Sequence, residues 1–307
     1  MAAIDAIVTA TSRLSLTNLE AWEGKLRAEL WKSKQVPSFS VRKFWRRPTR
    51  FVSWLDLSHS DGFKREEALR ALYEGAPNGF FFSLAVRRLN DWVPQVRAAA
   101  RDNLPLIAKR SDPEHVVDAL WKVLPHCSSW GRMEDADRQV LTDLVCIEGV
   151  TFALKSRIVS ATAGPTTAIF AQAGRTPALD RWLSEIAKNA IQPSVRAKAY
   201  RCQLEGRMVW VAGRKWAWTD LRWCEGRFEP ILGVRPLSLT SPFLEVLKMA
   251  LADRSPIVRR VAGDLLIQQL EIVGTEAVNL AKLLASDDSP SVAERGRFAL
   301  AQLSARP

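Results

Sequence analysis

Apolar residues along most of this 307-residue chain recur at spacings of three and four positions, which is the pattern of one helix face. Residues Leu179, Trp182, Leu183 and Ile186 illustrate it. The alternation of apolar and polar residues that marks a strand is missing from most of the chain. The pattern therefore predicts a mainly α-helical protein.

One arrangement of residues occurs five times within this helical pattern. A turn and a Pro or Gly are followed by an aliphatic residue at +2, Arg at +3, a small residue at +6 and Leu at +10. Lys64 departs from it in the first copy, Leu204 comes one place late in the third, and Ala293 departs in the last. The copies begin at Gly62, Pro94, Pro193, Pro256 and Pro290. Their spacings of 32, 99, 63 and 34 residues indicate a period near 33, since 99 is three such steps, and this predicts an α-solenoid of about seven helix pairs.

Proline and capping residues mark the predicted helix starts. Pro fits the first helical position because its missing N–H has no partner there. Ser255 and Ser289 each precede such a Pro and are expected to cap the helix with their hydroxyls. Thr176 and Pro177 likewise predict a helix that begins at 177.

The segment 207–237 is the exception to the helical pattern. It contains four Trp residues and short β-prone runs separated by turn residues. It also accounts for the 63-residue spacing, which is one repeat plus about 30 residues. We therefore expect an insertion, a β-hairpin or an ordered loop, on one face of the repeat array.

The predicted domain organisation follows from these landmarks. Residues 1–60 form an atypical N-terminal cap, and 61–206 form repeats that are degenerate at 126–175. The insertion occupies 207–237, and 238–307 form the C-terminal repeats.

The motif Pro-x-Val-Arg-x-x-Ala, preceded by a turn Asp as at Asp91 and Asp253, resembles the second helix of HEAT repeats over about 62–108 and 176–303. The resemblance implies that the turn Asp and the +3 Arg bond between neighbouring repeats. It assigns this structural role to Arg65, Arg97, Arg196 and Arg259. A role in contacting a ligand is the alternative.

Charge carries the information about partners. The net charge is +11, and residues 25–50 contain nine basic residues against one acidic residue. Cations there bind phosphates or carboxylates, and the interleaved aromatics can stack on unpaired bases. Alternatively, the aromatics pack the cap onto the first repeat. The candidate partner-binding residues are Arg42, Lys43, Trp45, Arg46, Arg47 and Arg50, with Arg214, Lys215, Trp216 and Trp218 of the insertion as a second contact.

Sequence motifs typical of catalytic or cofactor-binding sites are missing. The sequence has no phosphate-binding glycine loop, nucleophile elbow or HExxH motif. His115, His126, Cys127 and Cys146 lack ligand spacing, so we expect no metal and no cofactor. Four single cysteines and no secretory signal or membrane span indicate reduced thiols and a cytoplasmic protein.

These features predict a non-enzymatic α-solenoid scaffold that docks an anionic macromolecule, either an acidic protein surface or a nucleic acid. The pattern does not indicate an oligomeric state. The alternative function is DNA or RNA binding, including a glycosylase-like activity. A bacterial family of alkylpurine DNA glycosylases is built from HEAT-like repeats. Asp91 with Trp92, or Asp180 with Trp182, could resemble its functional pair, a similarity that rests on architecture alone.

Overall fold

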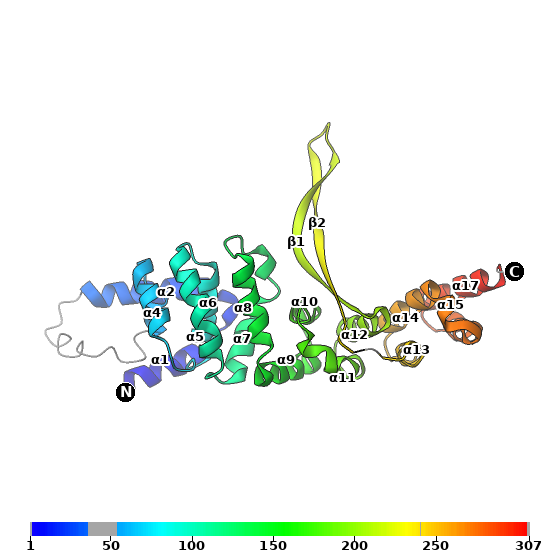
Figure 1. Ribbon diagram of the computed structural model, residues 1–307, viewed down its shortest axis with the longest axis horizontal. Coiled ribbons are helices and arrows are strands. Elements are labelled where there is room, and N and C mark those ends of the chain that lie inside the picture. Colours follow the sequence, from blue (N-terminus) through cyan, green and yellow to red (C-terminus); the bar gives the residue numbers. More distant parts are fainter. Residues whose placement is uncertain (1, 36–53, 240, 306–307) are drawn as a thin grey trace. The chain divides into compact units, whose positions relative to one another are not determined.

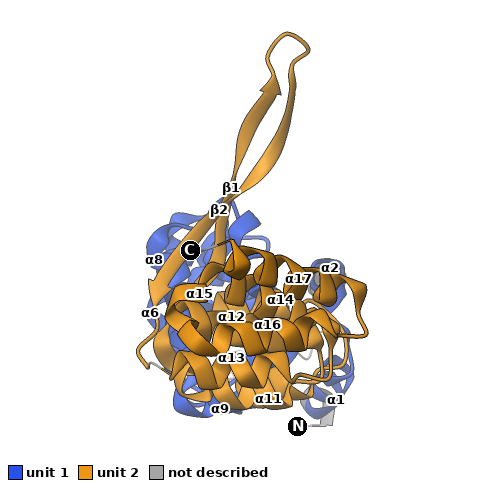
Figure 2. Cartoon of the chain, turned by 90° about the vertical axis from the view of Figure 1, so that its right-hand side faces the viewer, with its two compact units in different colours: residues 1–154 blue, residues 155–307 orange. Residues whose placement is uncertain are grey.

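A computed structural model describes residues 2–35, 54–239 and 241–305 of the chain. Over these residues the protein is mostly helical, with sixteen α-helices and one antiparallel pair of strands (Figure 1). The predicted helical fold and the predicted hairpin are thus confirmed. Among the described helices, none is long and apolar enough to span a bilayer. The chain divides into two compact units, residues 1–154 and 155–307 (Figure 2).

The first unit stacks its helices in a regular order. After α1 (Ala2–Ser12) and α2 (Leu19–Gln35), two rows alternate along the chain. One row is α4 (Gly62–Ala71), α6 (Pro94–Ala108) and α8 (Asp135–Val145), in which each helix packs on the next. The other row contains α5 (Gly79–Arg87), which packs on α7 (Pro113–Val123). Contact between every second helix is typical of stacked helix pairs. Helix α9 (Glu148–Ser160) crosses the boundary into the second unit.

The N-terminal helices pack against the start of this stack. The side chain of Asn78 donates to the carbonyl of Val8 at 3.0 Å and to the hydroxyl of Thr11 at 2.9 Å. The buried carboxylate of Glu23 accepts from Arg88 at 2.7 Å. Burial lowers the pKa of Arg88, while the charges of Glu23 and Asp91 oppose this effect. Buried, paired polar groups therefore join α1 and α2 to the first repeats.

The second unit repeats the arrangement around a long hairpin. Its helices are α10 (Thr166–Ala173), α11 (Leu183–Asn189), α12 (Pro193–Glu205), α13 (Phe243–Leu251), α14 (Pro256–Gln268), α15 (Leu270–Val273), α16 (Ala277–Ala285) and α17 (Pro290–Ser304). Helices α12, α14 and α17 pack successively, and α11, α13 and α16 each pair with the helix that follows. The hairpin of β1 (Arg207–Asp220) and β2 (Glu225–Pro236) lies between α12 and α13.

One predicted helix start and one predicted helix cap differ from the structure. Residues Pro177–Trp182 form a 3-10 helix, and the α-helix begins only at Leu183. Asp180 in this turn binds residues that follow the hairpin, so tertiary contacts set its conformation. At α17, Ser289 makes no capping bond to the helix; its hydroxyl lies 3.2 Å from that of Ser291. Ser255 does cap α14, as predicted, by accepting from the N–H of Ile257.

A guanidinium–carboxylate pair recurs between successive repeats. Arg65 donates through Nε and Nη2 to the two oxygens of Asp91, at 2.9 and 2.7 Å. Arg196 binds Asp253 in the same way, both at 2.9 Å, and Arg259 binds Asp287 at 2.6 and 2.9 Å. Two parallel bonds to one carboxylate give a fixed geometry as well as strength. We call these three pairs the Arg–Asp ladder.

Each ladder residue also satisfies nearby backbone groups. The remaining nitrogen of Arg196, Nη1, donates to the carbonyls of Ala190 and Ile191. The carboxylate of Asp253 accepts from the N–H of Ser255 at 2.8 Å, just before α14 begins. The pair of Arg196 and Asp253 therefore bonds both to the turn before α12 and to the turn before α14.

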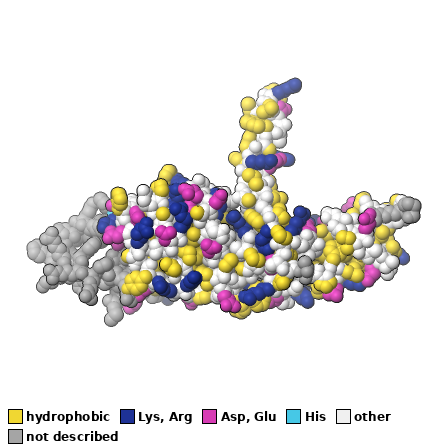
Figure 3. All heavy atoms as spheres, in the orientation of Figure 1, with side chains coloured by type: hydrophobic (Ala, Val, Ile, Leu, Met, Phe, Trp, Pro, Cys, Tyr) yellow, Lys and Arg dark blue, Asp and Glu magenta, His cyan; other side chains and the backbone are white. Residues whose placement is uncertain are grey.

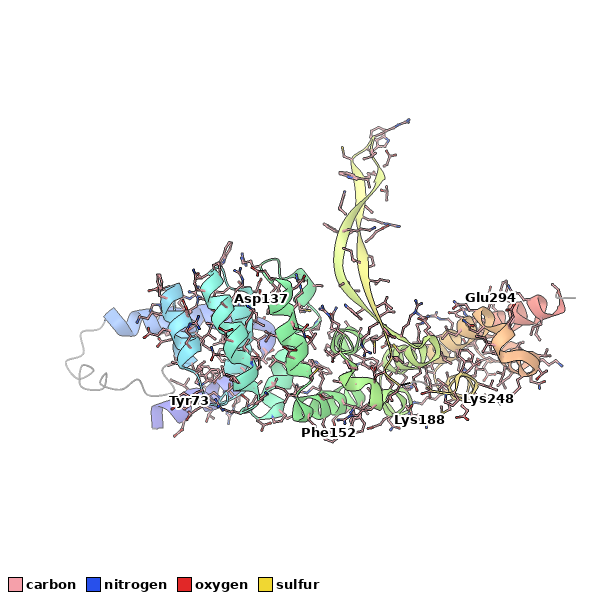
Figure 4. The ribbon with its side chains drawn as sticks, viewed as in Figure 1. Tyr73, Asp137, Phe152, Lys188, Lys248 and Glu294 are labelled. Atoms are coloured by element: carbon pink, nitrogen blue, oxygen red, sulfur yellow. The ribbon has the colours of Figure 1, made fainter. Side chains whose placement is uncertain are left out.

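Arg97 lies at the ladder position but binds differently. Its Nη1 donates to the carbonyl of Asp91, while its Nη2 donates to Glu134 at 3.1 Å. Its Nε lies 3.8 Å from Asp137, which is fully buried and accepts from Arg101 at 2.7 Å. Asp137, labelled in Figure 4, also forms a capping box with Glu134 at the start of α8. Glu134 and Asp137 thus stabilise the start of α8 and bind two arginines.

If the ladder holds the repeats together, Arg196→Ala will destabilise the protein strongly. The Arg196 side chain is 1% exposed, so its removal leaves the Asp253 carboxylate without its main partner. Breaking a buried pair in this way costs about 3–5 kcal/mol. Chemical denaturation of the full chain measures the loss. Arg201→Ala on the exposed side of the same helix is the matched control, expected within about 0.5 kcal/mol of wild type. Equal stabilities for the two variants would contradict a structural role.

The ladder also makes stability depend on pH. The hydrogen bond from Arg259 lowers the pKa of Asp287, although burial opposes it. A folded-state pKa below the unfolded value of about 3.9 means that the pair contributes fully above about pH 4. The contribution is lost as the pH falls through the folded-state pKa. We therefore expect Asp287→Asn to lower the melting temperature at pH 7 and the difference from wild type to shrink towards pH 3. Asp288→Asn, at an exposed neighbour, serves as control; a difference that does not change with pH would refute this origin.

Candidate macromolecule-binding hairpin

The hairpin is anchored at its base by a buried ion pair. Arg235 of β2 donates to both oxygens of Asp180, at 2.9 and 2.6 Å, and to the carbonyls of Gly174 and Thr176. Asp180 also accepts from the N–H and the hydroxyl of Ser238. Burial raises the pKa of Asp180, but these hydrogen bonds outweigh it and lower the pKa overall. The carboxylate is therefore charged and fully engaged.

Further contacts hold β1 at the same place. Met208 is fully buried, and its side chain lies against Gly174, where a Cβ would overlap it. Gln172 and Lys198 donate to the carbonyls of Val211 and Val209, each at 2.6 Å. These bonds satisfy the outer edge of β1 near the helices. The base of the hairpin is thus fixed to α10 and α12.

A glycine makes the passage from helix to strand possible. Helix α12 ends at Gly206, whose φ of 65° lies in the left-handed region. Glycine occupies this region without a steric cost, so the chain can leave the helix and enter β1 at the next residue. Beyond its base, the hairpin extends away from the helices of its own unit (Figure 2).

The strand register gives the hairpin two chemically different faces. Paired residues share a face, and faces alternate along each strand apart from irregularities of β1 after Val211 and after Trp218. The open face consists of Arg207, Val209, Val211, Arg214, Trp216 and Trp218 with Gly226, Phe228, Pro230, Leu232, Val234 and Pro236. The anchored face consists of Met208, Trp210, Gly213, Lys215, Ala217 and Asp220 with Glu225, Arg227, Glu229, Ile231, Gly233 and Arg235.

Charge separates these faces. Within the hairpin, which the structure describes completely, the acidic residues Asp220, Glu225 and Glu229 all lie on the anchored face. The charged residues of the open face are Arg207 and Arg214. Glu205 of α12 pairs with Arg207 at 2.9 Å, whereas no carboxylate of the described chain pairs with Arg214. The open face is therefore apolar and cationic, without a carboxylate of its own.

The open face also exposes large apolar side chains. Trp216, Trp218 and Phe228 are 44, 56 and 64% exposed, and Leu232 and Val234 are also exposed. Figure 3 shows hydrophobic side chains along much of the hairpin, with Lys or Arg side chains at its tip and about halfway along. A contiguous exposed apolar surface of this kind is typical of an interaction site.

The site residues that the sequence predicts do not all lie on the open face. Arg214, Trp216 and Trp218 lie together on the open face, whereas Lys215 lies on the opposite one. The sequence prediction did not include Phe228 and Leu232 of β2, although the position of Phe228 between Arg227 and Glu229 could have indicated it. The predicted residues Arg42, Lys43, Trp45, Arg46, Arg47 and Arg50 lie outside the described residues.

The carboxylates considered for a glycosylase-like site are engaged in structural bonds. Asp91 is buried, and it binds Arg65, Arg88 and the N–H of Val93. Burial raises its pKa, but these partners outweigh burial and lower it. Asp180 is bound by Arg235 as described above. Trp92 is exposed, with the guanidinium of Arg132 stacked 3.3 Å from its ring centroid. Neither carboxylate faces solvent beside an exposed aromatic.

No group of three or more His, Cys, Asp or Glu side chains is placed to hold a metal ion in residues 2–35, 54–239 and 241–305. All four cysteines lie in these ranges, and none forms a disulfide.

Comparison with known proteins identifies no family. No family model and no curated protein sequence matches the chain. A solved structure described as "Designed armadillo repeat protein YIII(Dq)4CqI" is similar over 82% of this chain and 98% of its own, at 16% identity and a TM-score of 0.26.

The anchoring predicts that Arg235→Ala will loosen the hairpin without unfolding the helices. Exposed Cys224 near the tip can carry a fluorescent dye in a Cys146→Ser background, because Cys127 is buried and burial raises the pKa of the Cys202 thiol to about 11. We expect lower steady-state anisotropy in Arg235→Ala than in the parent. Arg227→Ala, at an exposed position of β2 nearer the tip, should leave the anisotropy unchanged. Equal values for both variants would show that Arg235 does not anchor the hairpin.

Proposed function

We propose that the protein is a non-enzymatic binding scaffold built from helical repeats, and that the open face of its hairpin docks an anionic macromolecule. The observation that carries this proposal is the sidedness of the hairpin. One face joins exposed aromatic rings to an unpaired Arg214 without any carboxylate, while the other carries the acids and the anchor. Trp and Arg are also the residue types enriched in interface hot spots.

The rigid base supports this proposal. A hairpin of two strands is only marginally stable alone, so its conformation depends on what holds it. Here Arg235, Met208 and the bonds from Gln172 and Lys198 fix its base. A binding surface that is ordered in advance loses less conformational entropy when the partner docks.

We also propose that the repeats are HEAT-like and number about seven pairs. The Arg–Asp ladder supports this, since it recurs at the positions that the sequence motif marks. In this scheme residues 1–60 cap the array, 61–206 and 238–307 form repeats, and 207–237 is an insertion. Arg65, Arg97, Arg196 and Arg259 then have structural roles. A cytoplasmic location is a further prediction, from the single cysteines.

The basic segment around Arg42–Arg50 is proposed as a second contact for the same partner. Its charge favours an anion, as does that of the open face. A glycosylase-like activity finds less support, because Asp91 and Asp180 are occupied by arginines.

Two neighbouring substitutions test the proposal. Arg214→Glu and Lys215→Glu make the same charge change on opposite faces of β1. Immobilised heparin, polyglutamate, single-stranded DNA and duplex DNA serve as polyanion probes at low salt. We expect Arg214→Glu to weaken binding of at least one probe about tenfold and Lys215→Glu to weaken it less than threefold, as a single lost ion contact is worth about 1–2 kcal/mol.

Equal losses in both variants would mean that net charge alone attracts the probe and would contradict the open-face site. Binding of none of the probes would contradict an anionic partner. The quadruple variant of Arg42, Lys43, Arg46 and Arg47 to Glu reports the contribution of the basic segment separately. Circular dichroism shows whether each variant keeps the helical fold.

A further inference from the structure

We infer that the partner of the open face is single-stranded nucleic acid, whose unpaired bases stack on Trp218 and Phe228 while Arg214 binds the neighbouring phosphates. This inference rests on the proposed function and names its ligand. Three features of the open face carry it: the arrangement of its rings, the position of its cation, and the residue types that the hairpin lacks.

The three rings of the open face form one cluster, in which the central ring of Trp216 contacts the other two. Trp216 meets Trp218 at a centroid distance of 5.6 Å and an interplanar angle of 86°, and it meets Phe228 at 5.0 Å and 75°. The Trp216 ring also lies over Gly226, where an added Cβ would be 2.5 Å from it. Trp216 is thus the most enclosed of the three rings, and it holds two more exposed rings in edge-to-face contact.

Exposed, immobilised rings are suited to stacking on bases. Each base presents a π-face, and stacking on an aromatic side chain contributes about 1–3 kcal/mol per base. Trp218 and Phe228 come from opposite strands and are 56 and 64% exposed, so they can receive neighbouring bases of one strand. Their positions are set by Trp216, which reduces the entropy lost on binding.

The cation of the face lies at a useful distance from the rings. Arg214 is two residues from Trp216 on β1, and Trp216 is the register partner of Phe228, so Arg214 lies about 6.6–6.8 Å along the strands from the position of Phe228. A phosphate adjoining a stacked base is therefore within reach of its long side chain. Because no carboxylate of the described chain pairs with Arg214, it loses no internal partner when it binds a phosphate.

The hairpin lacks the amide side chains that read adenine edges. Residues 207–236 contain no Asn, Gln, His or Ser. Asn and Gln bind adenine edges in direct readout, whereas stacking tolerates every base. The expected ligand is therefore a single strand bound with little sequence preference.

Other anionic partners fit this face less well. In a duplex the bases are already paired and stacked, so the rings of the open face would find no free π-face and only Arg214 would contribute. An acidic protein surface would place carboxylates against an apolar, aromatic face, where they lose hydration without gaining hydrogen bonds. Both partners would leave Trp218 and Phe228 without a function.

Fluorescence anisotropy with a labelled 20-nucleotide oligothymidine tests the inference on the full chain. We expect Trp218→Ala and Phe228→Ala each to weaken binding roughly 5- to 150-fold, which is the stacking contribution of one base. Trp218→Phe keeps a ring and should recover most of the affinity. Trp92→Ala, which removes a still more exposed Trp from the first unit, should change it less than twofold. Circular dichroism and thermal melting of each variant show that the fold is retained.

The outcomes separate this inference from the proposed function. If Arg214→Glu weakens binding but Trp218→Ala and Phe228→Ala do not, an anion binds by charge alone and the stacking inference is wrong. If duplex DNA or polyglutamate binds more tightly than oligothymidine, the partner class is wrong, although the open face can still be the docking site. If no polyanion binds, both the stacking inference and the proposed anionic partner are wrong.

Discussion

A bidentate bond between a buried or half-buried arginine and the turn aspartate of the next repeat recurs at three places in the part of the chain that the structure describes. Each guanidinium also donates to carbonyls before its own helix, and each carboxylate accepts an N–H at the start of the next one. Buried charges are costly unless their hydrogen bonds are satisfied, and here nearly every donor and acceptor has a partner. The pairs therefore hold successive turns at a defined distance, and the apolar faces of the helices pack in the register that this distance allows.

The same bond explains how the array tolerates a long insertion. Arg196 and Asp253 are 57 residues apart, compared with 26 for Arg65 and Asp91, yet their geometry is the same. The hairpin follows α12 after Gly206 and ends before α13, so Arg196 and Asp253 still bind each other although the insertion lies between them in the chain. A further arginine–aspartate pair, Arg235 with Asp180, then fixes the base of the hairpin. The insertion is thus attached to the repeats by the same type of ion pair that joins the repeats to one another.

The sidedness of the hairpin links this anchoring to function. Met208 and Arg235 face the helices, and the register therefore turns Trp216, Trp218 and Phe228 to the opposite side. A surface of this kind is costly to leave in water unless a partner covers it part of the time. Its cationic character, with the acids on the other face, favours an anionic partner, and its rigid rings favour one with planar groups to stack.

The sequence by itself determined the helical class, the starts of the repeats and the presence of the hairpin. These are local properties, since helical periodicity, Pro at the first turn and β-prone runs between turn residues each depend on neighbours in the chain. It also marked Arg65, Arg196 and Arg259 through their constant distance from Pro or Gly. Only the tertiary structure decided that residues 177–182 form a 3-10 turn, because Asp180 there binds Arg235, 55 residues away. Likewise, a bulge after Val211 and the contacts of Met208 decide which face of the hairpin is open. A shift of one residue would exchange the two faces, so Arg214 and Lys215 could not be told apart until the strands were paired.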